Sequence, residues 1–418
     1  MSSQVKRGGK VWKAVVGVIS TVIIVGLFVA LLVLTASGRW VDSVSSDSAS
    51  VSHAVSQRRI TAYCPSRMTL PDASAYGDSE YQPSEGDISS SAGFAAFGAV
   101  YRSQFGAFGG SGDTTQLKDL DPTDTAKVIA ASADVDRTSL LFDTQLLESA
   151  AGVGASASVA SWATKGDLRG LSATFCDVGA LEQSFVLPDT QTGPTQQLVV
   201  ANPSAKATPV NIKVWGSDKS GALALSTGST LTVGAGKESV LNLAAAASGQ
   251  DALYVTVSSV DTPVAAVVRT IAMDGLVAKG SDYAVPNTVA AKTLAIDGLT
   301  EGDAVNLYVY PSRQADVTVS WTDDQGLKKT NQQTLESNRV SVIDLGSVPK
   351  SATGLTISAS EPVSVAAKIT NDGDAPEKDA KEGGGLSALR KAVEAEKGSM
   401  KTIFEPVFCL RIQLPFKE

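Results

Sequence analysis

Apolar and polar residues alternate one by one in several short segments of the chain. In one of them Val210, Ile212 and Val214 alternate with Asn211 and Lys213. A strand with this period of two buries one face and exposes the other, as strands of antiparallel sheets do. Turn-forming residues separate these segments, and the same alternation recurs at 253–257, 317–321 and 355–357. The pattern therefore predicts a mainly β fold with antiparallel sheets.

Two stretches of about 100 residues share the same order of segments. The first contains VVANPSAKATPVNIKVW and the second contains LYVYPSRQADVTVSW. Equivalent positions pair at similar offsets: Pro203 with Pro311, Trp215 with Trp321, Leu243 with Leu345, and Pro263 with Pro362. Short strands in units of this length, without a long helical pattern, predict tandem immunoglobulin-like β-sandwiches. Trp321 is in phase with its apolar face whereas Trp215 is not, so we expect the two tryptophans to pack differently.

A run of 25 uncharged residues, from Ala14 to Gly38, precedes this β-rich part. A transmembrane helix needs about 20 apolar residues, so the run is long enough to cross a bilayer. Four cations precede it, which predicts a cytoplasmic N-terminus and an extracytoplasmic remainder at the cell membrane. Trp12 and Trp40 are expected at the two membrane interfaces. A cleaved signal peptide is the alternative, but its apolar region spans only roughly 7–15 residues, so we favour an uncleaved signal-anchor helix.

The sequence predicts seven consecutive segments. A cytoplasmic basic tail (1–13) precedes the transmembrane helix (14–38) and a Ser-rich stalk (39–59). A first β-rich domain with a Gly/Phe-rich insertion (60–186) is followed by the two sandwich repeats (187–278 and 279–370). A charged linker, a short helix and an atypical tail make up 371–418. The tail from Lys401 is either a closing strand or the product of a shifted reading frame, and the sequence leaves both open.

Charge and residue usage argue against several classes of function. The net charge is −8 although the first 13 residues carry +4, so we expect no cationic surface for nucleic acid. The single histidine, His53, lies in the Ser-rich stalk, and no P-loop, G-x-S-x-G or dinucleotide-binding motif occurs. We therefore expect no catalytic residue, no metal site and no cofactor. A pair of carboxylates acting on glycans remains open, because 43 acidic residues allow many pairings.

Two cysteines, Cys64 and Cys176, fall within the first predicted domain. Outside the cytoplasm a disulfide between them is the simplest interpretation, and it would close a loop of about 110 residues. Two free thiols are the alternative, since some bacterial envelopes oxidise weakly. A disulfide would leave Cys409 in the atypical tail unpaired.

Five aromatic residues of a Gly-rich stretch follow one another at spacings of three and four: Phe94, Phe97, Tyr101, Phe105 and Phe108. A helix would align them on one face. Such a face would offer a contact patch to a partner or to the outer leaflet of the membrane. The alternative is that these side chains pack within their own domain, which is the more common fate of aromatic residues at this spacing.

Several short motifs follow the uncharged run in a fixed order: Cys64-Pro65, Arg169-Gly170-Leu171, residues 198–203 (LVVANP) and residues 262–267 (TPVAAV). Together they resemble a large-exoprotein-like family of actinobacterial membrane-anchored exported proteins of unknown function. The resemblance covers roughly residues 15–370 and implies an envelope protein with a β-rich ectodomain, and a Cys64–Cys176 pairing fits the family pattern. Members are often encoded beside envelope glycosyltransferases, which hints at glycan assembly. The family supplies no catalytic residues, and its usual C-terminus differs from Lys401–Glu418.

We therefore expect a non-enzymatic, single-pass envelope protein whose extracytoplasmic sandwiches bind or scaffold other molecules. The expected partners are the membrane and either envelope polysaccharide or a glycosyltransferase, and not nucleic acid. A glycan-active enzyme or enzyme accessory is one alternative, for which an acidic cleft between sandwiches would speak. A passive spacer is the second alternative, and it would need no concave pocket.

Overall fold

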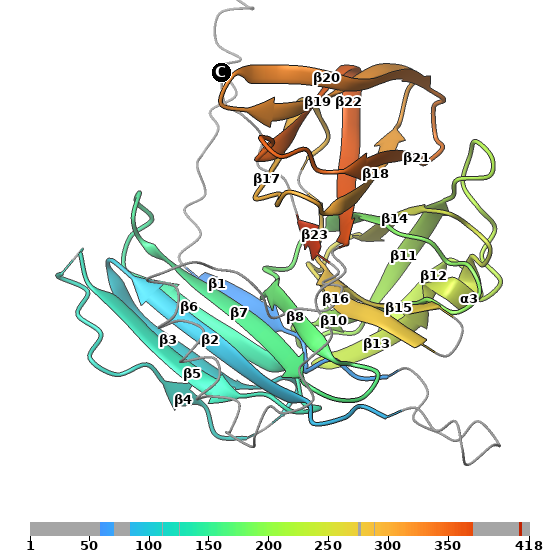
Figure 1. The fold of residues 1–418 in the computed structure, drawn as a ribbon. Helices are drawn as coiled ribbons and strands as arrows, with labels where there is room; N and C mark the ends of the chain where they lie inside the picture. Colours follow the sequence, from blue (N-terminus) through green and yellow to red (C-terminus); the bar gives the residue numbers. More distant parts are fainter. Residues whose placement is uncertain are drawn as a thin grey trace, which may run out of the picture. The chain divides into compact units, whose positions relative to one another are not determined.

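The computed structural model describes residues 59–70, 84–110, 112–124, 126–274, 277–287, 289–370 and 409–411. All of them belong to one compact unit, Gln57–Glu418. The described elements are antiparallel strands and one short helix, so the predicted mainly β fold is confirmed. The strands form three successive sandwiches, here called first, second and third (Figure 1).

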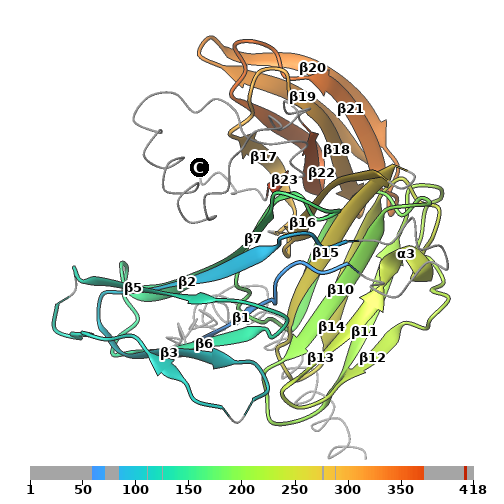
Figure 2. The ribbon, with the colours of Figure 1, turned by 60° about the horizontal axis from the view of Figure 1, so that its bottom comes forward.

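The first sandwich contains two four-stranded sheets, with strand orders β1-β6-β3-β4 and β5-β2-β7-β8. Figure 2 shows β1, β6 and β3 in one layer and β5, β2 and β7 in the other. Aromatic and small apolar side chains from both layers form its core, including Phe94, Phe105 and Phe142. The strands are β1 (Arg59–Cys64), β2 (Ser89–Phe97), β3 (Val100–Ala107), β4 (Thr115–Gln116), β5 (Val128–Asp134), β6 (Leu140–Leu146), β7 (Gly154–Ala163) and β8 (Gly170–Phe175).

The second sandwich has sheets of order β13-β10-β15-β16 and β12-β11-β14-β9. The alternating residues Val210, Ile212 and Val214 all point into its core, as the sequence predicts. Its elements are β9 (Glu182–Leu187), β10 (Thr195–Asn202), β11 (Thr208–Trp215), β12 (Thr230–Val233), β13 (Lys237–Asn242), α3 (Leu243–Ala246), β14 (Leu253–Ser259), β15 (Ala265–Asp274) and β16 (Val277–Ala284). Because β16 pairs with β15, the second sandwich extends beyond the predicted boundary at residue 278.

The third sandwich is built around one long strand that belongs to both of its layers. The first half of β22 pairs with β17 and β19, and its second half pairs with β18 and β23. The strands are β17 (Ala291–Asp297), β18 (Ala304–Pro311), β19 (Ala315–Asp323), β20 (Gly326–Leu335), β21 (Ser341–Ser347), β22 (Gly354–Thr370) and β23 (Cys409–Arg411). Of the atypical tail, only Cys409–Arg411 falls within the described residues.

All three sandwiches have the same topology. When the strands of each are numbered in chain order, one sheet has the order 5-2-7-8 and the other has the order 4-3-6-1. In the third sandwich β22 serves as both the sixth and the seventh strand, and β23 takes the eighth place. Pro263 separates the sixth and seventh strands of the second sandwich, and its equivalent Pro362 lies between the two halves of β22. The internal repeat therefore also includes the first sandwich, whose sequence is less regular.

In the second and third sandwiches, the preceding sandwich covers the outward face of the 5-2-7-8 sheet. Tyr63 and Met68 of the first sandwich pack against Val199 and Val267 of the second. In the same way Val186 and Ala252 of the second sandwich pack against the third, at Tyr308, Tyr310 and Ala366. Strands buried on both faces are apolar at nearly every position, which explains the uninterrupted apolar runs LVVA of β10 and AAVV of β15.

The linkers between sandwiches repeat one hydrogen-bonded arrangement. Asp177 lies just before the second sandwich. It exchanges backbone hydrogen bonds of 2.8 Å with Tyr63 in β1, the first strand of the first sandwich. Its Oδ2 accepts hydrogen bonds from Ala266 N (2.9 Å) and Gln183 Nε2 (2.7 Å). Asn287 lies just before the third sandwich and likewise binds β9, the first strand of the second sandwich. Its Nδ2 donates a hydrogen bond to Val365 O (2.9 Å). Ala266 and Val365 are equivalent positions of the repeat. Each linker side chain therefore forms a hydrogen bond with the same position of the sandwich that follows it.

Burial raises the pKa of Asp177, because desolvation outweighs the hydrogen bonds that its carboxylate accepts. A carboxyl group with a raised folded-state pKa stabilises the fold below its usual pKa of 3.8, and this stabilisation is lost as the pH rises through the folded-state pKa. Asn at this position still accepts both hydrogen bonds and does not titrate. We expect Asp177→Asn to gain stability relative to wild type between pH 4 and pH 7, as measured by thermal unfolding at both values. A constant difference between the two proteins would contradict this.

Candidate functional site

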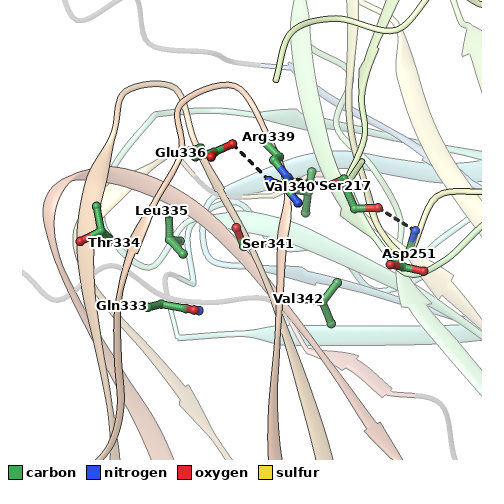
Figure 3. A pocket seen from close by; sticks show the side chains of 10 residues that line it. All are labelled: Ser217, Asp251, Gln333, Thr334, Leu335, Glu336, Arg339, Val340, Ser341 and Val342. Carbon is green, nitrogen blue, oxygen red and sulfur yellow. Dashed lines mark hydrogen bonds and ion pairs between the residues drawn. The ribbon is translucent and has the colours of Figure 1, made fainter. Parts of the chain in front are cut away.

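A hollow lined by described residues lies where the second and third sandwiches meet. It is open to solvent and has a volume of about 360 Å³, and we call it the junction hollow. The end of β20, the following turn and the start of β21 form one wall, and loops of the second sandwich at Ser217 and Asp251 form the other (Figure 3). Its volume is at the lower end of those of small-molecule sites.

A turn with a left-handed residue shapes the wall from the third sandwich. Asn338 has a φ of 55°, a conformation that Asn tolerates better than most residues. Its backbone N–H donates to Pro311 O (2.8 Å), and its side-chain oxygen accepts a hydrogen bond from Tyr310 Oη (3.1 Å). Gly221 N of the second sandwich donates to Asn338 O (2.8 Å). These contacts fix the turn against the second sandwich.

Gln250 organises the opposite wall. This buried side chain accepts hydrogen bonds from Ser217 N (3.0 Å) and Asp218 N (3.2 Å), and it donates to Asp218 Oδ2 (3.0 Å). Gly216 leaves room for it, because a Cβ there would lie 2.0 Å from Gln250 Oε1. The hydrogen bonds of Gln250 therefore fix the conformation of the loop that carries Ser217.

Charged groups of both signs line the junction hollow. Arg339 donates from Nε to Ser217 O (2.6 Å), and its Nη1 lies 3.1 Å from Glu336 Oε2. Asp251 receives a hydrogen bond from Gln191 Nε2 (2.9 Å), and its own backbone N–H donates to Ser217 Oγ (2.8 Å). Figure 3 shows Arg339 between Glu336 and Ser217. The hollow thus combines two carboxylates and a guanidinium with nearby hydroxyl and amide groups.

Three aromatic rings lie beside this hollow. Tyr254 of the second sandwich stacks on Tyr310 of the third with ring centroids 3.7 Å apart, and Trp215 contacts both at about 5.5 Å. Val340 belongs to this cluster and also lines the hollow. Burial raises the pKa of Tyr310 to about 12, so its hydroxyl group remains protonated and donates to Asn338. As expected, the two tryptophans pack differently, because Trp321 lies in the core of the third sandwich.

The predicted disulfide is present. Cys64 at the end of β1 and Cys176 directly after β8 are bonded, with a sequence separation of 112 residues. The bond joins the first strand of the first sandwich to the residue that precedes the linker Asp177. The alternative of two free thiols is therefore not what the structure shows.

The five aromatic residues do not align on one helical face, whereas the alternative of packing within their own domain holds for Phe94 and Phe105. Gly98, with a φ of 75°, lies in the tight turn that carries the chain from β2 in one sheet of the first sandwich to β3 in the other, so the spacing of three and four spans two strands and not one helix. Phe94 and Phe105 stack in the core with ring centroids 4.2 Å apart. Phe108 packs on Tyr63 (5.2 Å), Phe97 is half-buried, and Tyr101 is exposed. They do not form one contact patch.

Other predicted features lie outside the described residues. These are the uncharged run 14–38, the interface residues Trp12 and Trp40, and His53. Within the described part of the chain, no helix is long and apolar enough to span a membrane. In the same ranges no three His, Cys, Asp or Glu side chains gather as a metal site would require.

Sequence reasoning did not single out the residues of the junction hollow. Asp251, Glu336 and Arg339 lie in separate turns of two repeats, and only the packing of the sandwiches brings them together. Asp177, a carboxyl group whose pKa burial raises, lies in the first linker and does not line the hollow. The two carboxyl groups of the hollow take part in an ion pair and in a hydrogen bond, respectively Glu336 with Arg339 and Asp251 with Gln191.

Comparison with known proteins places the chain in a family without assigning an activity. No curated protein and no solved structure matches it. A family model does match, over residues 129–397, from β5 of the first sandwich to beyond the end of β22. This range is more than half of the 418 residues. The chain therefore belongs to DUF5719, a family of unknown function, which agrees with the expectation of an uncharacterised family.

Proposed function

We propose that this chain is a single-pass membrane protein of an actinobacterial cell envelope whose three extracytoplasmic sandwiches bind envelope polysaccharide through the junction hollow. The uncharged run 14–38 would supply the anchor. The Cys64–Cys176 disulfide supports a location outside the cytoplasm, because disulfides persist in oxidising compartments. A glycosyltransferase held on the same scaffold would place the protein near glycan assembly.

The observation that carries the binding proposal is the chemistry of the junction hollow. Saccharides present many hydroxyl groups, which donate to carboxylates such as Asp251 and Glu336 and accept from guanidinium groups such as Arg339. The surrounding turns are held by hydrogen bonds between the two sandwiches, so these groups are positioned in advance. A passive spacer would need no such hollow.

The proposal predicts binding that depends on these two carboxylates. On an array of envelope polysaccharides, detergent-solubilised full-length protein should bind at least one glycan. Asp251→Asn with Glu336→Gln should weaken that binding by at least about tenfold, because each substitution removes a charged hydrogen-bond acceptor. The control Glu182→Gln with Asp261→Asn removes two exposed acids outside the hollow and should bind as wild type does. Equal binding by both double variants would refute the site.

A glycan-active enzyme is the second candidate, because two carboxylates share the hollow. Glycoside hydrolysis requires one carboxyl group to stay protonated as the general acid. Glu336 instead forms an ion pair with Arg339, and a general acid at this position would first have to leave that pair. Release of reducing ends from a bound polysaccharide, abolished by Glu336→Gln alone, would establish the enzyme. Binding without release would support the non-enzymatic function.

A further inference from the structure

Several strands of the first sandwich begin or end at the same end of the domain. β1 enters at Arg59, which is paired with Gln145 near the end of β6. Phe97 at the end of β2 is paired with both Val128 at the start of β5 and Gly154 at the start of β7. Leu147 N donates to Ala99 O (2.8 Å), and Gly98 N donates to Lys127 O (3.0 Å). The chain from the N-terminal segment therefore reaches the sandwich at this end.

Three large side chains at this end are exposed. They are Tyr101 (51% exposed), Val128 (67%) and Leu147 (52%), and we call them the N-terminal rim. The half-buried Phe97 lies next to Val128 in the sheet. Tyr101 Oη donates to Gln145 Oε1 (2.5 Å), which orients its ring at the surface. Exposed apolar side chains at one end of a domain offer a surface for contact with an apolar partner.

Charged groups around the N-terminal rim are of both signs. Cations are contributed by Arg59, Arg102 and Lys127, and acids by Asp121, Asp124 and Glu148. Arg59 is engaged with Asp143, and Arg102 with Gln104. Attraction to an anionic partner would therefore be weak, so contact at this end must depend on the apolar side chains.

The predicted anchor ends at Gly38, and β1 begins at Arg59. The 20 intervening residues span at most about 70 Å even when fully extended. A tether of this length keeps the first sandwich at a high local concentration beside the bilayer, so even weak insertion becomes effective. Tyr is also one of the residues most favoured at the lipid–water interface.

We infer that the N-terminal rim docks into the lipid–water interface of the membrane that anchors the chain. This inference rests on the anchor in the proposed function and is independent of the junction hollow. The rim inserts Tyr101, Val128 and Leu147 among the headgroups and first acyl carbons. The junction between the second and third sandwiches remains available for glycan.

Photo-crosslinking to lipid tests this docking in the full-length protein. The chain is reconstituted in vesicles of phosphatidylcholine and phosphatidylglycerol that contain a phospholipid with a diazirine in its acyl chain. After illumination, mass spectrometry should find lipid on peptides containing Tyr101, Val128 and Leu147. Raising the salt from 50 to 500 mM should leave the labelling unchanged, because the contact is apolar.

Charged substitutions provide matched variants. Tyr101→Glu, Val128→Glu and Leu147→Glu together should reduce labelling of the rim at least about tenfold, since charges are costly in the interface. All three positions are exposed, so the fold should tolerate them. The control Val178→Glu, Leu181→Glu and Val260→Glu changes exposed apolar residues beside the first linker and should leave rim labelling intact.

Two results would overturn the inference in distinguishable ways. Labelling confined to residues 14–38, with none at the rim, would show an anchored chain whose first sandwich does not dock. A chain that fails to sediment with the vesicles would contradict the anchor, and the docking with it. Neither result would affect a glycan array performed on the junction hollow.

Discussion

Replacing both Cys64 and Cys176 with Ala is expected to lower the free energy of unfolding of the first sandwich by about 3–5 kcal/mol. The disulfide closes a loop of more than 100 residues, and a crosslink over that length strongly restricts the unfolded chain. It also secures β1, an edge strand that pairs only with β6 in its sheet. Without the bond, β1 should separate first, together with the contacts that Tyr63 makes to the second sandwich.

Hydrogen exchange followed by mass spectrometry measures this effect segment by segment. In the double variant, amides of β1 and β6 should exchange faster, whereas those of the third sandwich should not change. Cys409→Ala is the control, because it removes a cysteine of the tail and leaves the disulfide in place. Unchanged exchange in β1 and β6 of the double variant would mean that packing alone holds the first strand.

The period of two in the sequence correctly predicts strands and their inward faces. Val317 and Val319, for example, lie in the core of the third sandwich as their alternation requires. The pairing of Trp215 with Trp321 is one residue out of structural register, because the inward equivalent of Trp321 is Val214. A sequence alignment matches residue types, whereas a sheet fixes which face each residue occupies, and a shift of one residue reverses that face.

The aromatic spacing in residues 94–108 shows where a pattern can mislead. A tight turn between strands of two sheets also places residues at separations of three and four, as a helix does. Gly98 and the small residues around it were the available signal for a turn, because a residue with positive φ is most often glycine. Phe94 and Phe97 differ by an odd number of positions, so in a strand they face opposite sides.

The junction hollow and the linkers could not be read from periodicity. Their residues lie in turns, where no repeat of apolar positions constrains the sequence, and their partners lie in another sandwich. The repeat alone identifies one side of each linker contact, because Ala266 and Val365 are equivalent positions. Asp177 and Asn287 are counterparts, because they bind these two equivalent positions from the linkers.

The hydrogen-bond partners of the two linker side chains explain why residue 177 is Asp and residue 287 is Asn. Asp177 faces the N–H of Ala266 and therefore needs an acceptor, whereas the Nδ2 of Asn287 faces the carbonyl oxygen of Val365 and must donate. The Oδ1 of Asn287 also accepts from Val186 N (2.7 Å), within a buried strand. Only an amide side chain satisfies both partners of the second linker.

Asn287→Ala is therefore expected to lower the free energy of unfolding of the third sandwich by about 2–4 kcal/mol. The substitution leaves the buried Val186 N–H without its side-chain partner and removes the bond to Val365 O, and each lost partner costs about 1–3 kcal/mol. Asn287→Asp should be as destabilising, because it brings a carboxylate against a carbonyl oxygen. Asn211→Ala, at an exposed position of β11, is the matched control and should be nearly neutral.

Calorimetry and limited proteolysis distinguish local from global effects of Asn287→Ala. If the linker couples the two sandwiches, the variant should unfold in separate steps, and protease should cleave first between β16 and β17. Binding of glycan at the junction hollow should fall at the same time, since the hollow requires both walls to stay in place. A variant that unfolds like wild type and keeps its binding would show that the aromatic contacts of Trp215, Tyr254 and Tyr310 hold the junction without the linker.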